Sequence, residues 1–300
     1  MIAIIGILIG MLLPAVQQVR EAARRSACMN NSRQQMLAIL NFESTRQHFP
    51  PAWNGDGSTD GFGNDSDEFL DPFVAGFGNF YGWQTFILPF AEQNNLHDTL
   101  NFAQSWSQTD VDPATGLAPS NRAIPTYTCP SDIIDEGHTK YSGDNGDLNG
   151  RSSYVMCLGS LSFGNRRNEV DGFRDLWGVG WQDQKTTFNS MVDGSSNVLF
   201  LGERDNVKMN SGGDHGGIWI GVQLNRERAV VGRGPGSATD FVNAPNGANI
   251  GWNVAASLHI GGAVISLGDG SVSFLSDNVS LEVMKNLCAI GDGAVTGTFK

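Results

Sequence analysis

The first nineteen residues of the chain, Met1 to Val19, carry no charged side chain and are mostly apolar. A helix of about 19 residues is about 28 Å long, which is close to the thickness of the hydrocarbon core of a bilayer. A helix that is apolar all round must be covered by lipid or by other protein. This segment therefore restricts the fold to one in which a long apolar helix has a membrane or a protein partner.

The helical pattern continues after the apolar segment. Apolar residues still recur every three or four positions, which is the spacing of one helix face. Pro14 is the only proline in this stretch, and a packed or membrane helix accepts it as a kink. We therefore predict one helix from Ile2 to about Phe42, with residues 1–42 as an N-terminal helical part and residues 43–300 as a globular head.

Two simpler interpretations of the apolar segment stay open. A cleaved secretory signal would end at a small-residue cleavage site, but the sequence continues without an obvious break into Arg20. A plain membrane anchor fits the length, although the arginines that follow would then place the head on the cytoplasmic side. A start upstream of Met1 would remove this conflict in orientation.

The charge of the chain is unevenly distributed. Residues 1–50 carry five arginines and two glutamates, whereas residues 51–300 carry 14 basic and 29 acidic side chains. The net charge of −12 excludes a protein whose main role is to bind nucleic acid, because phosphate contacts need a basic face. The chain is 40% hydrophobic and 17% charged, so an acidic, folded and soluble head is expected.

Short apolar runs separated by Gly, Pro, Asn and Asp make up the head. The strongest local signal is Gly268-Asp269-Gly270-Ser271, which lies between two apolar runs and is typical of a hairpin turn. The pattern as a whole predicts an α+β fold, in which the long helix packs on an antiparallel β-sheet head with long loops. The expected elements are strands at Asn197–Gly202, Gly217–Leu224, Ala263–Leu267 and Val272–Leu275, a helix at Ala91–Leu100, and a short helix or strand at Trp83–Phe90.

One acidic loop has the ligand spacing of a calcium site. Oxygen-bearing side chains stand at positions one, three, five, nine and twelve of the segment, and Gly61 stands at position six, where a sharp turn is needed. A solvated acidic loop without a cation is the alternative, because no helix obviously precedes the segment. The candidate Ca²⁺ ligands are Asp56, Ser58, Asp60, Asn64 and Asp67.

His259 and Asp269 could belong to a hydrolytic site with Ser257 or Ser271 as nucleophile. The simpler interpretation is structural: Asp269 and Gly270 make the turn, and His259 hydrogen-bonds the start of the hairpin. We therefore expect no catalytic site and no enzymatic activity.

The four cysteines are too widely spaced for a zinc knuckle. If the head is exported, a disulfide between Cys129 and Cys157 is the preferred pairing, with Cys28 and Cys288 free and buried. Other pairings stay open, because sequence alone does not determine connectivity.

Several short motifs identify a family to which the chain is similar. The apolar residues 2–16 are followed by Phe49-Pro-Pro, and His259 stands ten positions before Asp269-Gly270. The chain resembles type IV pilins and type II secretion pseudopilins, and more narrowly the prepilin-like DUF1559 family of Planctomycetes. Further motifs behind the resemblance are Gly82-Trp83-Gln84, Cys129-Pro130-Ser131-Asp132 and Gly202-Glu203-Arg204.

The resemblance implies a structural subunit of a type IV pilus-like or pseudopilus filament. It implies that the helix lies in the inner membrane before assembly and that its partners are copies of the chain and the pilus or secretion assembly machinery. The filament would then stand at the cell surface or in the periplasm, and the true N-terminus is expected upstream of Met1. The helix residues expected to bury one another are Ile2, Ile4, Ile5, Ile7, Leu8, Leu12 and Val16.

A membrane-anchored extracytoplasmic binding module is the alternative function. It would use Ca²⁺ or an exposed aromatic surface to bind glycans or another cell surface. The tryptophans proposed for that surface are Trp53, Trp83, Trp106 and Trp177.

Overall fold

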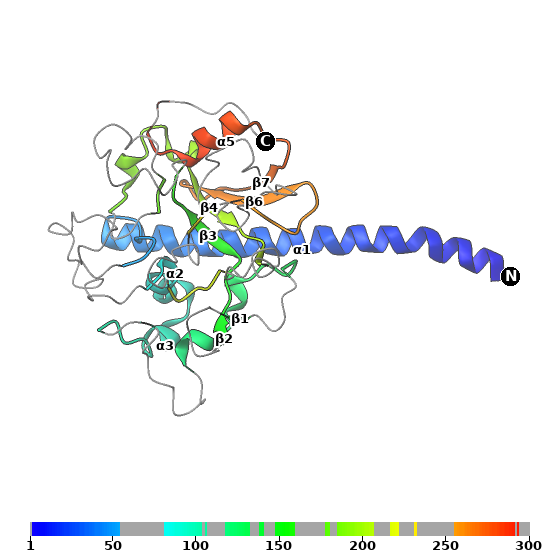
Figure 1. Ribbon diagram of the computed structural model, residues 1–300, viewed down its shortest axis with the longest axis horizontal. Coiled ribbons are helices and arrows are strands. Elements are labelled where there is room, and N and C mark those ends of the chain that lie inside the picture. Colours follow the sequence, from blue (N-terminus) through cyan, green and yellow to red (C-terminus); the bar gives the residue numbers. More distant parts are fainter. Residues whose placement is uncertain are drawn as a thin grey trace.

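The computed structural model shows one long helix that runs through a head and projects far beyond it (Figure 1). The N-terminus is at the free end of this helix, and the C-terminal part of the helix lies among the elements of the head. The residues that the structure describes are 2–54, 81–103, 106, 118–132, 138–140, 148–159, 178–180, 185–206, 217–221, 231–232, 255–291 and 293.

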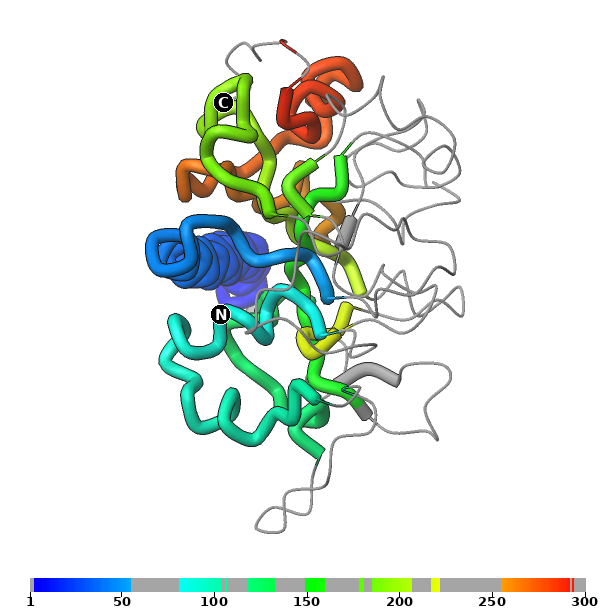
Figure 2. The backbone as a smooth tube through the Cα atoms, turned by 90° about the vertical axis from the view of Figure 1, so that its left-hand side faces the viewer, coloured from blue at the N-terminus to red at the C-terminus, as the bar shows by residue number. Residues whose placement is uncertain are grey.

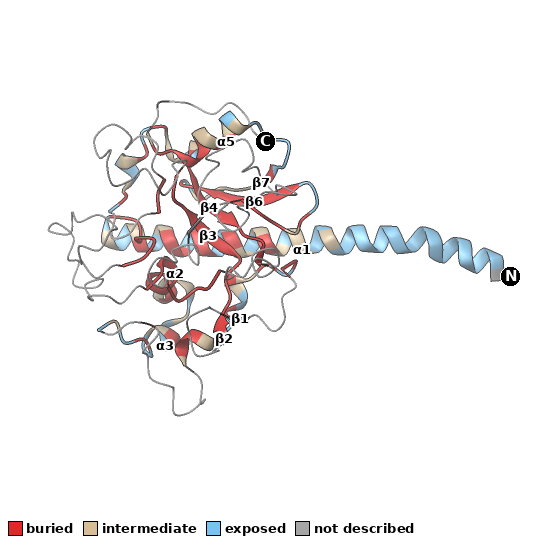
Figure 3. Cartoon of the chain, in the orientation of Figure 1, coloured by how far each residue is buried: buried red, intermediate tan, exposed pale blue. Residues whose placement is uncertain are grey.

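Helix α1 (Ile2–Arg46) is continuous over 45 residues and contains Pro14. It ends at Arg46, four residues after the predicted end at Phe42. Residues 3–20 are exposed on all sides, whereas the second half buries a single face (Figure 3). The buried positions are one to four residues apart and lie on one side of the helix, as a helix that faces a core requires; they are Cys28, Ser32, Gln35, Met36, Ala38, Ile39 and Phe42.

The main sheet has the strand order β5-β3-β4-β6-β7. Strands β3, β4, β6 and β7 are antiparallel to their neighbours, and only the two-residue strand β5 pairs in parallel. The α+β fold class with an antiparallel sheet is therefore confirmed. The strand bounds are β3 (Tyr154–Cys157), β4 (Leu199–Glu203), β5 (Val231–Gly232), β6 (Gly262–Leu267) and β7 (Val272–Ser276).

The predicted hairpin is formed by β6 and β7. Gly270 has φ 85°, a backbone conformation that residues with a Cβ rarely adopt. The Asp269 carboxylate accepts a hydrogen bond from the Ser271 amide at 2.8 Å. A Cβ atom at Gly270 would also lie 2.8 Å from Leu40 Cδ1 on α1. Glycine at this position thus permits both the turn and its close approach to the long helix.

Smaller elements surround α1 and the sheet. The Trp83–Phe90 segment, predicted as a short helix or strand, is helical. The predicted helix at Ala91–Leu100 is shorter than expected and corresponds to α3 (Asn94–His97). Of the predicted strand at Gly217–Leu224, the described residues 217–221 form only isolated bridges, from Ile218 to Arg151 and from Gly221 to Tyr81. The remaining elements are α2 (Trp83–Phe86), η2 (Leu88–Ala91), α3 (Asn94–His97), η4 (Pro119–Asn121), η5 (Pro125–Tyr127), β1 (His138–Lys140), β2 (Leu148–Gly150), η9 (Phe188–Ser190), η10 (Ser195–Asn197) and α5 (Leu281–Cys288).

The second half of α1 is part of the hydrophobic core of the head. Figure 2, which views the molecule along α1, shows the helix beside the strands of the sheet. Buried polar contacts add to this packing: Tyr154 Oη donates to the Cys28 carbonyl at 2.9 Å, and Gln35 Nε2 donates to the Thr126 carbonyl at 2.8 Å. Because hydrogen-bonded polar groups between packed elements allow few alternative positions, these contacts set the register of the helix on the head.

Candidate functional site

The projecting part of α1, residues 2–19, is here called the stem. It lacks charge, and its large apolar side chains from Ile4 to Val19 are between 44% and 72% exposed. Among the described residues, α1 is the one helix long and apolar enough to cross a membrane. None of its most apolar segment is buried in the described part of the head. The stem is therefore compatible with a membrane anchor or a signal sequence. The exposed apolar residues are Ile4, Ile5, Ile7, Leu8, Ile9, Met11, Leu12, Leu13, Val16 and Val19.

Charged side chains mark the point where the stem meets the head. Arg24 Nη2 lies 2.7 Å from Oε2 of Glu21, which is one turn earlier in the helix. The Arg25 guanidinium lies 4.0 Å from the centre of the Phe274 ring on β7 and donates to the Ile260 carbonyl at 3.3 Å. The boundary between exposed apolar helix and packed helix is therefore set by contacts with the β6–β7 region.

A disulfide bond between Cys28 and Cys129 joins α1 to the segment that follows η5. The predicted Cys129–Cys157 pairing is wrong, because η5 packs against α1 and brings Cys129 within 4.9 Å of Cys28, measured between Cα atoms. Cys157 lies on β3 beside α5, and its thiol donates to the Cys288 carbonyl at 3.8 Å. Cys288 is free and buried as predicted, whereas Cys28 is not free.

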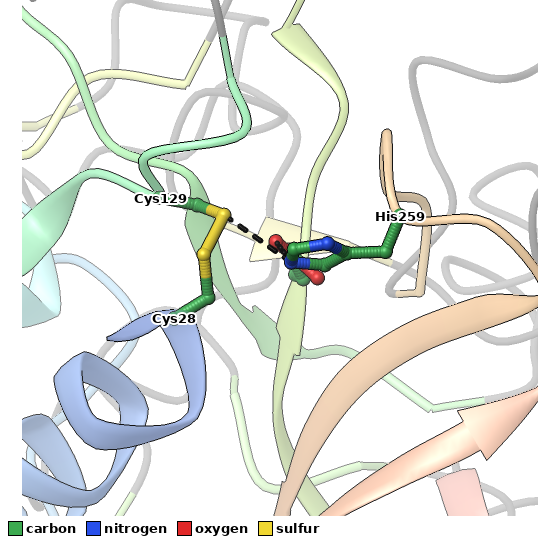
Figure 4. Close-up of side chains that lie close together, drawn as sticks. Cys28, Cys129 and His259 are labelled. Carbon is green, nitrogen blue, oxygen red and sulfur yellow. Dashed lines mark hydrogen bonds and ion pairs between the residues drawn. A yellow bond between two sulfur atoms is a disulfide. The ribbon is translucent and has the colours of Figure 1, made fainter. Parts of the chain in front are cut away.

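His259 is buried directly beside this disulfide (Figure 4). Its Nδ1 lies 2.5 Å from Glu21 Oε1 on α1, and its Nε2 lies 3.5 Å from Cys129 Sγ. The same Nε2 is 3.4 Å from Glu203 Oε1 at the end of β4. We call the five side chains Glu21, Cys28, Cys129, Glu203 and His259 the His259 cluster.

Glu203 is the most deeply buried carboxyl group of the His259 cluster. Its Oε2 accepts a hydrogen bond from the Val264 amide at 3.0 Å. Burial raises the pKa of Glu203 to about 8, against an ordinary value of 4.5. A carboxyl group with this pKa holds its proton at neutral pH, so the cluster does not bury two adjacent negative charges in the oxidised protein.

The structure separates two residues that sequence reasoning considered together. Asp269 and Gly270 make the turn after β6, as predicted, whereas His259 precedes β6. Six strand residues span about 20 Å, so His259 and the exposed Asp269 lie at opposite ends of the strand and do not form a catalytic pair.

The contact between His259 and Glu21 was not anticipated from the sequence. The sequence holds one indication that Glu21 lies on the side of the helix that carries Cys28: the two residues are seven positions apart and therefore share a face.

The alternative binding surface is not supported for three of its tryptophans. Trp53, Trp83 and Trp106 are at most 3% exposed and belong to the core, so the expectation of exposed aromatic rings at these positions is wrong. Trp177 lies outside the described residues. The candidate calcium ligands also lie outside the described residues, and the calcium loop stays a prediction; they are Asp56, Ser58, Asp60, Asn64 and Asp67.

Comparison with known proteins identifies a family over most of the chain. The family model described as a protein of unknown function (DUF1559) matches residues 17–282, which include the packed half of α1, the His259 cluster and the β6–β7 hairpin. No curated protein and no solved structure matched the chain. With this match over far more than half of its length, the chain belongs to the DUF1559 family.

Proposed function

We propose that the protein is a structural subunit of a type IV pilus-like or pseudopilus filament that assembles through its stem. The observation that carries this proposal is the exposure of the stem: α1 is one continuous helix, yet none of the apolar stem is buried by the part of the head that the structure describes. A helix of this composition needs a partner outside its own chain.

The same apolar surface can be covered in two successive environments. The 18 residues of the stem span about 27 Å, which matches a bilayer core before assembly. In a filament the stems of neighbouring copies would cover one another, and burying each large aliphatic side chain contributes about 1.5–3 kcal/mol. Because the contact between copies would be head-to-tail and would not close into a ring, it would produce a helical filament.

The head would hold each stem in a defined position. The Cys28–Cys129 disulfide and the Glu21–His259 contact fasten α1 close to the point where it leaves the head. The excess negative charge of residues 51–300 would keep the assembled heads in water. This role requires no catalytic residue, and we propose none.

Electron microscopy of the full chain tests the proposal. Purified protein in detergent should form filaments when the detergent is removed. Leu8→Lys places an unpaired charge among the stems and should abolish filaments. Leu37→Lys is the matched control, because Leu37 is 60% exposed on the packed half of the same helix, and this variant should assemble normally. Monodisperse single particles of the unaltered chain at high concentration would contradict the proposal.

Disulfide cross-linking distinguishes a filament from a plain membrane anchor. A cysteine introduced as Leu12→Cys should cross-link copies of the chain under mild oxidation, because stems in a filament lie about 8–10 Å apart. Val192→Cys on the head is the control for random collision, since Val192 is 76% exposed. Equal cross-linking of the two variants would favour a monomeric anchored module instead.

A further inference from the structure

The His259 cluster combines side chains of the types that bind metal ions. One atom from each of four residues (the two cysteine sulfurs, a Glu203 oxygen and a His259 nitrogen) lies within 4.8 Å of the other three, and all four residues are buried. They come from α1, from the segment after η5, from β4 and from the segment before β6, so the fold as a whole brings them together. Two sulfurs with one nitrogen and one oxygen form a donor set that suits Zn²⁺ better than Mg²⁺ or Ca²⁺.

The distances around His259 agree with a tetrahedral site. Bond lengths of about 2.3 Å for Zn–S and about 2.0–2.2 Å for Zn–N and Zn–O place neighbouring ligands about 3.6 Å apart for sulfur and nitrogen, and about 3.4 Å for nitrogen and oxygen. The observed separations from His259 Nε2 are 3.5 Å to Cys129 Sγ and 3.4 Å to Glu203 Oε1. Two edges of the tetrahedron are therefore already at the length that a bound ion requires.

Glu21 orients the histidine as an outer carboxylate does in zinc sites. Its Oε1 is 2.5 Å from Nδ1, which fixes the ring with Nε2 toward Cys129 Sγ and Glu203 Oε1. Figure 4 shows the ring of His259 directed at the disulfide. Metal-bound histidines commonly donate their second N–H to a carboxylate in this way. Arg24 binds the other oxygen of Glu21 and so holds the carboxylate in place.

We propose that reduction of the Cys28–Cys129 disulfide converts the His259 cluster into a site for a divalent metal ion of the Zn²⁺ class, with Cys28, Cys129, Glu203 and His259 as ligands. A dithiol reductant gives two electrons and two protons and becomes a disulfide, whereas a phosphine gives two electrons and becomes a phosphine oxide, with water supplying the oxygen and the two protons; either reaction yields two thiols. Binding of Zn²⁺ then releases the two thiol protons and the Glu203 proton to solvent. Two thiolates on one tetrahedral ion lie about 3.8 Å apart, so the disulfide and the metal exclude one another.

Zinc and cobalt binding by the full chain in detergent tests this proposal. After reduction with a water-soluble phosphine and removal of excess metal, we expect one Zn²⁺ per chain, a higher Tm with Zn²⁺ than with a chelator, and visible Co²⁺ bands of a tetrahedral site with thiolate charge transfer. The oxidised chain should bind neither ion. A reduced chain whose Tm does not respond to Zn²⁺ and which acquires no Co²⁺ bands would overturn the proposal, whether or not it stays folded without metal.

Variants separate the ligands from the other thiols of the chain. Cys28→Ser and His259→Gln should lose the Co²⁺ spectrum, whereas Cys157→Ala/Cys288→Ala should keep it, because these two buried thiols lie elsewhere. Glu21→Gln should keep the spectrum but weaken Zn²⁺ binding about 10- to 100-fold, as expected of a positioning residue. Retention of the thiolate bands in Cys28→Ser/Cys129→Ser would assign the metal to other residues and overturn the proposed site.

Discussion

The two halves of α1 are one helix with two different surroundings. The stem carries no charge and is exposed on all sides, whereas the second half buries one mostly apolar face against the described part of the head. Both halves are helical because the hydrogen bonds of a helix are local and do not depend on what surrounds them. The difference shows that helix formation and burial are separate questions: the second half is covered by its own chain, and we propose that the first half is covered by partners from outside it.

Removal of the stem should have the largest effect, on the solubility and the assembly of the chain. A chain that lacks residues 2–19 keeps Glu21, Cys28 and the packed half of α1, so we expect a soluble head that forms no filaments and leaves the membrane fraction. Sedimentation of the truncated and full chains without detergent measures the change. An insoluble truncated chain with an unfolded far-ultraviolet spectrum would show that the head depends on the stem.

Loss of the Cys28–Cys129 disulfide should have the next largest effect, on the free energy of unfolding. The bond closes a loop across a sequence separation of 101 residues, for which chain entropy predicts a contribution of about 4.7 kcal/mol to the free energy of unfolding. Urea unfolding of Cys28→Ala/Cys129→Ala should reveal this loss. The control, Cys157→Ala/Cys288→Ala, removes two buried thiols without opening a cross-link and should cost clearly less; equal losses would mean that the disulfide is not what fastens the helix.

Substitutions on opposite sides of the packed half should differ strongly. Phe42 is fully buried, and Phe42→Ala should lower the free energy of unfolding by about 3–5 kcal/mol because it leaves a cavity. Leu37 is 60% exposed on the same helix, and Leu37→Ala should change it by no more than about 0.5 kcal/mol. Denaturation midpoints of the two variants test the assigned face, and a reversed order would place the wrong side of α1 against the sheet.

The pH dependence of stability should show the buried state of Glu203. In the oxidised chain with a chelator present, the folded state holds the Glu203 proton up to about pH 8, while the unfolded chain releases it near pH 4.5. The free energy of unfolding should therefore fall as pH rises between these values, by at most about 1.4 kcal/mol per pH unit. Glu203→Gln resembles the neutral carboxyl group and should flatten this slope; an unchanged slope would show that Glu203 is ionised in the folded protein.

Local patterns in the sequence were enough for several elements. The long helix, the β6–β7 hairpin and the β4 strand were all predicted near their observed positions, because apolar spacing and an Asp-Gly turn act over a few residues. The alternative in which tryptophans form a binding surface failed for Trp53, Trp83 and Trp106. Residue type does not reveal whether an aromatic ring faces the core or water.

The His259 cluster shows what local patterns cannot reveal. Its members stand at positions 21, 28, 129, 203 and 259, and no spacing rule connects positions so far apart. Cys129–Cys157 was the preferred pairing for an exported head, but η5 packs on α1 and places Cys129 beside Cys28. The family motifs marked Cys129, Glu203 and His259 separately, and only the fold brought them into one site.

Amino-acid order alone was sufficient to define an apolar helical stem, an acidic head and a sheet with a tight Asp-Gly hairpin, since charge, hydrophobicity and turn preference belong to individual residues and their near neighbours. Which cysteines pair, which face of α1 is buried and how Glu21 reaches His259 depend on the packing of α1 against β6, β7 and η5. These contacts join residues up to 238 positions apart. Long-range contacts of this kind follow from how whole elements fit together, which is a property of the folded chain and not of any segment within it.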